Sequence, residues 1–207
     1  MIRGSVNLAV CASADTTNVF SIGAPWGGSL EDPRLLYTIQ EPGVDGYLGR
    51  WHSVTLTWDG QVIILGWEPG GGAAPECEAT DLPVTKSMFF YDAASGAKLG
   101  QWTLPRPQSA EENCMIHNYN IVAPRSGRYV AVSGNYQAGI WVTEFTDPAN
   151  PTTVAWSDPP PLVPTSSAVP GRPTGTTTSS SSRRSPRAST SSGSATSAWP
   201  GRASSVI

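Results

Sequence analysis

Two histidines are the residues of this 207-residue chain whose spacing most favours a chemical site. His52 and His117 occupy the same place in two similar stretches, "WHSVTLTWDG" and "IHNYNIVAPRSG", where each begins a run of alternating residues. Imidazole nitrogens bind transition metals, so two equivalent histidines brought together could hold an ion or contact a substrate. Carboxylates that could complete such a site are Glu68, Glu76 and Glu111. The alternative is structural, with each imidazole hydrogen-bonded to the backbone of a neighbouring repeat.

Two histidines are few for a zinc site, and the chain has no His-x-His or Cys-x-x-Cys spacing. The residues predicted to bind a ligand therefore also include aromatic rings and polar groups near loops: Trp51, His52, Trp67, Glu68, His117, Asn118 and Tyr136. Exposed rings of this kind, Trp26 included, can form a platform for carbohydrate or peptide, although such rings more often pack between repeats. No cofactor is predicted, and a metal ion at the histidines is the alternative.

Other patterns that would name a reaction are incomplete. The loop stretch "EPGGGAAPE" is rich in glycine but lacks the Lys-Ser/Thr pair of a phosphate-binding loop. Ser53 and Ser133 have no histidine and aspartate partners at recognisable positions. Acidic residues that lack the spacing of a calcium loop are Glu68, Glu76, Glu78 and Asp81. No catalytic residue is predicted.

The elements that must position these residues are strands. Alternation with period two runs through residues 1–160, and glycine, proline and β-branched residues interrupt every helical candidate. The strands group into three recurring units, at 6–39 with three strands and at 51–104 and 116–157 with four. Such units cannot bury both faces alone and stack on one another, as propeller blades do. The prediction is an all-β fold, a partial β-propeller of antiparallel four-stranded blades over 1–162, with a β-sandwich as the rival.

Three cysteines form at most one pair. In a propeller, the loop that carries Cys77 and the loop that carries Cys114 share one face, which predicts a Cys77–Cys114 disulfide, with free buried thiols as the alternative. Such a bridge stabilises mainly by restricting the unfolded chain. Cys11 falls within a predicted strand and is expected to be a small buried apolar residue.

Composition excludes some classes of partner. A net charge of -3 gives no basic surface for nucleic acid, and no apolar run approaches the roughly 20 residues of a membrane helix. The first residues, "MIRGSVNLAVCASAD", imitate a secretion signal, but the uninterrupted apolar run at 8–11 is too short. A buried strand is the better interpretation, and no convincing signal peptide is predicted in this chain.

The stretch "YVAVSGNYQAGIWVTEFTDPANPTTVAWSD", residues 129–158, resembles the LVIVD-repeat β-propeller proteins of bacterial surfaces. Those proteins have an apolar strand that ends in an acidic residue, here Glu144, and then a Thr/Ser-Asp-Pro-x-x-Pro turn, here 146–151. The unit at 61–105 keeps the strand spacing but has residues 93–96 in place of that turn. The resemblance covers roughly 6–160. It implies a propeller fold and an extracellular or cell-surface location, and no catalytic residue.

The composition changes abruptly near residue 163. Residues 163–207 contain no Asp, Glu, Lys, Asn, Gln, His, Phe, Tyr, Cys or Met, and are rich in Ser, Thr, Pro and Arg. They are predicted to form a disordered low-complexity tail. Propellers close with about four to eight blades, so three units predict an incomplete ring. A shift of one base in the codons of 175–196 permits a further strand pattern, which leads to the hypothesis that the tail is an out-of-frame translation of another blade.

The function expected from these patterns is non-catalytic. The chain is predicted to be a secreted or cell-surface repeat scaffold that binds protein or carbohydrate, in a truncated form with little independent activity. The alternative is a propeller enzyme with a metal or cofactor held at the channel mouth by His52 and His117. No nucleic-acid partner and no membrane span are expected.

Overall fold

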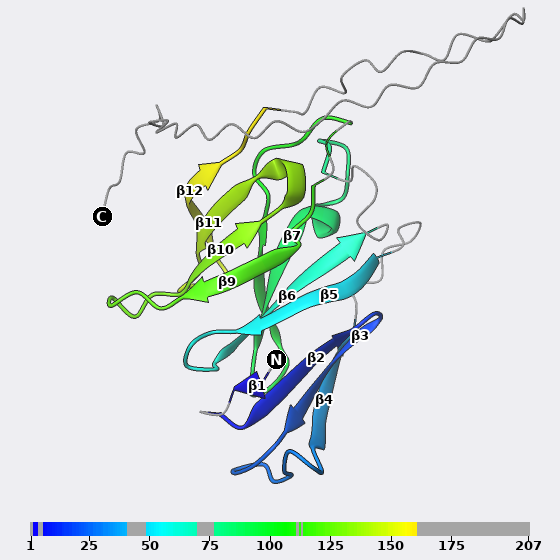
Figure 1. The fold of residues 1–207 in the computed structure, drawn as a ribbon, viewed down its shortest axis with the longest axis vertical. Helices are drawn as coiled ribbons and strands as arrows, with labels where there is room; N and C mark the ends of the chain where they lie inside the picture. Colours follow the sequence, from blue (N-terminus) through cyan, green and yellow to red (C-terminus); the bar gives the residue numbers. More distant parts are fainter. Residues whose placement is uncertain are drawn as a thin grey trace, which may run out of the picture. The chain divides into compact units, whose positions relative to one another are not determined.

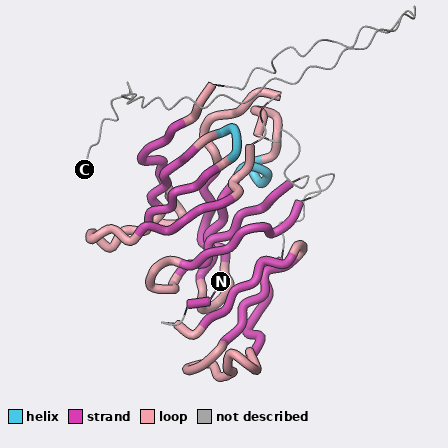
Figure 2. Tube along the Cα trace, viewed as in Figure 1, coloured by secondary structure: helices cyan, strands magenta, loops and turns pink. Residues whose placement is uncertain are grey.

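The fold is all-β, with three antiparallel sheets of four strands each (Figures 1 and 2). The computed structural model describes residues 2–3, 6–40, 49–69, 77–110, 112 and 114–160. Apart from strands, these residues form two short 3-10 turns, η2 (Pro83–Lys86) and η3 (Tyr136–Ala138). No helix in these ranges is long and apolar enough to cross a membrane. The predicted disordered tail and its frame-shift interpretation fall on 163–207, outside the described residues.

Each sheet is built from consecutive strands. Sheet 1 contains β1 (Ile2–Arg3), β2 (Leu8–Ser13), β3 (Thr16–Ser21) and β4 (Arg34–Gln40). Sheet 2 contains β5 (Gly49–Leu56), β6 (Val62–Pro69), β7 (Ser87–Asp92) and β8 (Lys98–Thr103). Sheet 3 contains β9 (Asn118–Val122), β10 (Val130–Gly134), β11 (Ile140–Glu144) and β12 (Thr152–Ser157).

The three sheets coincide with the three units predicted from the sequence. The unit at 6–39 was expected to supply three strands, and in the structure β1 adds a fourth by pairing Ile2 with Ala9 and Arg3 with Leu8. Sequence neighbours pair throughout, so every sheet is an up-and-down meander. A meander of this kind needs only short turns, which agrees with the glycine and proline content of the chain.

Sheet 2 is buried on both of its faces. Alternate residues of β6 and β7 divide between two core clusters, because neighbouring side chains in a strand point to opposite faces. Cluster A contains Val62, Ile64, Met88 and Phe90 from sheet 2 with Tyr119, Ala131, Trp141 and Phe145 from sheet 3 and its connections. Cluster B contains Ile63, Leu65, Trp67, Phe89 and Tyr91 from sheet 2 with Leu8, Val10, Val19 and Ile39 from sheet 1.

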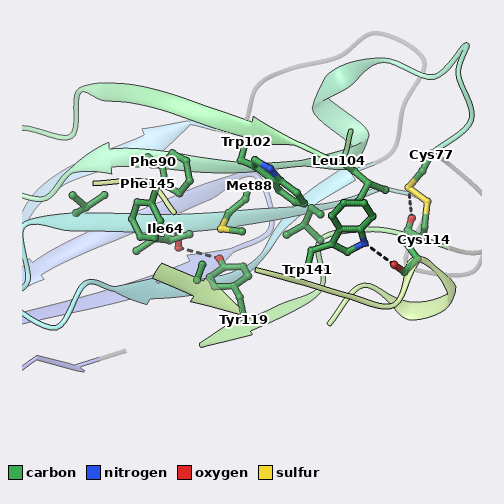
Figure 3. Close-up of a cluster of buried hydrophobic side chains, with 14 residues drawn as sticks. Ile64, Cys77, Met88, Phe90, Trp102, Leu104, Cys114, Tyr119, Trp141 and Phe145 are labelled. Carbon is green, nitrogen blue, oxygen red and sulfur yellow. Dashed lines mark hydrogen bonds between the residues drawn. A yellow bond between two sulfur atoms is a disulfide. The ribbon is translucent and has the colours of Figure 1, made fainter. Parts of the chain in front are cut away.

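Aromatic rings join the two sheets within cluster A. Phe90 stacks on Phe145 with ring centroids 4.5 Å apart and planes 4° from parallel. Figure 3 shows this pair at one end of the cluster and Trp141 near the other, beside Trp102. The Tyr119 hydroxyl donates a hydrogen bond to the Ile64 carbonyl at 3.0 Å, so a polar contact satisfies this buried hydroxyl in an apolar layer.

In two places, a turn of one sheet packs against the outer strand of the preceding sheet. The turn after β7 lies against β4, where the Tyr37 hydroxyl donates to the Ala93 carbonyl at 2.6 Å. A side chain at Gly96, where φ is +75°, would lie 2.7 Å from the Tyr37 ring. The turn after β11 lies against β8 in the same way, because Pro148 touches Gly100 so closely that a Cβ there would collide with it. The two glycines therefore allow equivalent turns to cover the neighbouring outer strand.

A hydrogen bond from Tyr129, the residue before β10, to the β5–β6 turn adds a polar link. The Tyr129 hydroxyl donates to Asp59 Oδ2 at 2.7 Å. Burial alone would raise the pKa of Asp59, but hydrogen bonds from Thr57 and Tyr129 outweigh burial and lower that pKa below 3.8. The carboxylate is therefore held in its charged form by contacts that exist only in the folded chain.

The predicted Cys77–Cys114 disulfide is confirmed. Both residues are buried, and their Cα atoms lie 5.9 Å apart. The bond sits at the end of cluster A, beyond Trp141 (Figure 3). The prediction for Cys11 was wrong, because its side chain is exposed. Leu8 and Val10 are the residues of β2 that reach the core, so the alternation of the strand turns Cys11 outward.

Removing the disulfide tests its contribution to stability. The bridge closes a loop with a sequence separation of 37, and the entropic model assigns such a loop about 4 kcal/mol. We expect Cys77→Ala with Cys114→Ala to lower the free energy of unfolding by about 2–5 kcal/mol in urea titration. Cys11→Ser is the matched control and should change that energy by less than about 0.5 kcal/mol. Equal stability of the two variants would contradict a bridge that restrains this loop.

Tyr129→Phe tests the link to Asp59. The change removes one hydroxyl, and we expect the free energy of unfolding at neutral pH to fall by about 1 kcal/mol. The folded-state pKa of Asp59 is depressed, so its stabilisation is present above 3.8 and is lost as the pH falls through the folded value. The difference between variant and parent should therefore shrink in acid. A difference that is constant with pH would show that the carboxylate plays no part.

Candidate functional site

The candidate site lies where the first strands of sheets 2 and 3 meet. Strands β5 and β9 lie against each other. The hydroxyl of Tyr119, on β9, shares its proton between the carbonyl oxygens of Ser53 and Ile64, at 2.9 and 3.0 Å. Gly66 allows this approach, since a Cβ there would lie 2.7 Å from the carbonyl oxygen of Ile116. The residue before β9, His117, is thereby brought to the edge of sheet 2.

A β-bulge directs His52 out of the core. In the pairing of β5 with β6, Trp51 lies opposite Trp67, whereas Ser53 lies opposite Gly66, so His52 has no partner in the register. A bulge bends the strand and changes the direction of a side chain. Trp51 fills cluster B, and His52 reaches the surface with 38% of its side chain exposed.

Glu68 lies between the two histidines. Its Oε2 is 3.0 Å from Nδ1 of His52, and its Oε1 is 3.6 Å from Nε2 of His117. The two imidazole rings stack with centroids 4.5 Å apart and planes 23° from parallel. One ligand atom from each of the three side chains lies within 4.8 Å of the other two. The predicted pairing of the histidines with a carboxylate is thus present in the structure, with Glu68 as the carboxylate.

Tyr136 and Asn118 flank this trio. The Tyr136 ring lies 4.7 Å from the His117 ring, and its side chain is well exposed. Tyr136 has a φ of +50°, a region that bulky residues rarely adopt, at the start of η3. The side-chain amide of Asn118 lies 2.6 Å from Nδ1 of His117 and leaves its Nε2 toward Glu68. Five predicted site residues therefore form one polar and aromatic surface, which we call the rim: His52, Glu68, His117, Asn118 and Tyr136.

The charges of the rim shift the ionisation of its members. Burial and the neighbouring His52 lower the pKa of His117 below 6.5, and the Glu68 carboxylate opposes this shift. Burial, with the charge of Glu68 and a hydrogen bond to it, raises the pKa of the Tyr136 hydroxyl. His117 is therefore biased toward the neutral imidazole, the form that accepts a hydrogen bond or binds a metal.

The remaining predicted residues lie elsewhere. Trp51 and Trp67 are almost fully buried in cluster B, so they support the rim and do not line it. Glu76 and Glu111 lie outside the described residues. Asp81 accepts a hydrogen bond from the Glu78 amide at 2.8 Å, which closes a local turn.

One surface feature was not anticipated from the sequence. A cleft of about 300 Å³ is lined by Pro105, Arg106, Trp141, Thr153 and Trp156. Trp156 lies opposite Trp141 in the register of β11 and β12, and the two rings stack at 5.8 Å. Arg106 pairs with Asp158 at its edge. The predicted turn at 146–151 joins two antiparallel strands, and the register of such a hairpin sets Trp141 opposite Trp156. That register could have predicted from the sequence that both rings lie on one face.

No family model matches the chain, and no curated protein matches it. The resemblance to LVIVD-repeat proteins therefore rests on the strand and turn residues quoted above.

NMR titration of the imidazole signals tests the electrostatics of the rim. In metal-free buffer, we expect His52→Gln to raise the pKa of His117, because a neighbouring positive charge is lost. Glu68→Gln should lower that pKa further, because the opposing carboxylate is lost. Asn120→Ala, an exposed change on the same strand, should leave it unchanged. A pKa that moves the same way in both rim variants would contradict the arrangement.

Proposed function

We propose that the chain is a non-catalytic repeat scaffold of the propeller type, secreted or held at a cell surface, whose function is to bind an external protein or carbohydrate at the rim. The observation that carries this proposal is the convergence of His52, Glu68 and His117, with Tyr136 beside them, at the junction of two sheets. The sheets supply rigidity, and the rim supplies aromatic and polar contacts.

The propeller interpretation is supported by how the sheets repeat. Each is a four-stranded meander, successive sheets pack face to face, and the first strands of sheets 2 and 3 are neighbours. The turns at Gly96 and after β11 cover the preceding outer strand in equivalent ways. In a sandwich, a middle sheet buried on both faces by sheets of the same topology is not expected. Location outside the cell is supported by the Cys77–Cys114 disulfide.

A binding role, rather than catalysis, is supported by the chemistry of the rim. The two serines considered as nucleophiles, Ser53 and Ser133, both have buried hydroxyl oxygens. The Ser133 hydroxyl donates to the Trp141 carbonyl and accepts from Asn135 in the core. Tyr136, by contrast, presents an exposed ring with a polar tip, which is typical of recognition surfaces.

Binding to arrays tests the proposal. The full chain should bind at least one member of a glycan array or of a panel of immobilised extracellular proteins. Tyr136→Ala should weaken that binding at least tenfold, equivalent to about 1.4 kcal/mol, because the exposed ring is lost. Val122→Ala, an exposed change at the far end of β9, is the matched control and should bind normally.

Two outcomes would contradict this function. Binding that is equal in Tyr136→Ala and in the control would move the ligand away from the rim. Turnover of a bound glycan or peptide that is lost in His117→Ala would favour the alternative, a metal-dependent enzyme.

A further inference from the structure

We propose that His52, Glu68 and His117 form a binding site for one divalent transition-metal ion of the zinc class. The inference rests on the proposed function for the location of the binding surface, and it deepens that function by adding an ion through which a ligand would be held.

The donor atoms select the class of ion. Two imidazole nitrogens and one carboxylate oxygen suit zinc, copper, nickel or cobalt, whereas calcium and magnesium take oxygen ligands almost throughout. Two histidines and one glutamate are also a known set of three protein ligands for zinc sites that keep a fourth position open. The rim therefore provides the donors of an open transition-metal site.

The distances between the donor atoms are close to those found around a bound metal ion. Ligand atoms about 2.1 Å from a tetrahedral ion lie roughly 3.4 Å from each other. Oε2 of Glu68 lies 3.0 Å from Nδ1 of His52, and Oε1 lies 3.6 Å from Nε2 of His117, so each imidazole faces its own carboxylate oxygen at a distance close to that value. All three ligand atoms lie within 4.8 Å of one another, so small side-chain rotations bring them around one ion.

The exposure of the trio leaves room for an external ligand. The side chain of Glu68 is 13% exposed, that of His117 23% and that of His52 38%. The carboxylate is therefore the innermost donor, and the two imidazoles open toward solvent. An ion on this trio would present its free position on the outer side, next to the exposed Tyr136 ring.

The surrounding fold holds the donors in place. His52 is directed by the bulge in β5, Glu68 stands on β6, and His117 is anchored by the Tyr119 hydrogen bonds to sheet 2. Asn118 holds the ring of His117: its amide nitrogen lies 2.6 Å from Nδ1, which keeps Nε2 on the side of Glu68.

Titration with Zn²⁺ tests the site. The full chain, without a histidine tag and with Cys11→Ser to remove the exposed thiol, should bind one equivalent of Zn²⁺ in calorimetry or chelator competition. Each of His52→Ala, Glu68→Gln and His117→Ala should weaken binding by more than roughly 100-fold, because two donors remain. Asn120→Ala is the control on β9 and should bind as the parent does.

A second measurement guards against misfolded variants. Zn²⁺ should raise the Tm of the parent and of Asn120→Ala, and it should leave the Tm of His117→Ala unchanged. Absorption of a Co²⁺ complex should show ligand-field bands without a thiolate charge-transfer band. No stoichiometric binding, or equal binding in folded His117→Ala, would overturn the metal site.

The failure of the metal site and of the proposed function can be told apart. Zn²⁺ binding is measured with the metal alone and needs no glycan or protein. Ligand binding that persists in chelator and depends on Tyr136 would support the scaffold and overturn the metal as its link to the ligand. Zn²⁺ binding without any ligand on the arrays would support the metal site and leave the scaffold function contradicted.

Discussion

Burial of both faces of sheet 2 is the constraint on which the rest of the structure depends. Its two inner strands carry apolar side chains in unbroken succession, from Val62 to Leu65 on β6 and from Met88 to Tyr91 on β7. Neither face can remain in water without a large cost, since each large side chain contributes about 1.5–3 kcal/mol when buried. Sheets 1 and 3 must therefore pack on opposite sides, and the order of the three sheets follows.

The rim is a consequence of that packing. Stacking of sheet 3 on sheet 2 places β9 beside β5, and this brings His52 of β5 within stacking distance of His117, the residue before β9. Neither sheet alone contains the trio, because His117 comes from one and His52 and Glu68 come from the other. The chemistry at the surface thus depends on aromatic and aliphatic contacts in cluster A beneath it.

Much of this arrangement could be predicted from the sequence, and the rest depends on details that alternation does not show. Strand positions, the Cys77–Cys114 bridge and the approach of the two histidines follow from period two and from repeated units. The choice of Glu68 among the carboxylates needs the register of β5 on β6 with its bulge at His52. Trp51 and Trp67 were predicted at the ligand surface, but their side chains are buried in cluster B. The presence of a tryptophan near a loop does not show whether its ring faces solvent or the core.

The unequal covering of the three sheets also has a consequence for the order in which the molecule opens. Strands β6 and β7 lie between two cores, whereas the side chains of β12 are almost all exposed and β1 pairs through two residues. Local opening costs least where few apolar contacts are lost. Amide protons of the two outer sheets should therefore exchange with solvent through partial openings. Those of β6 and β7 should exchange only when the whole molecule unfolds. The rim, which needs both sheets, is then lost earlier than the centre of the fold.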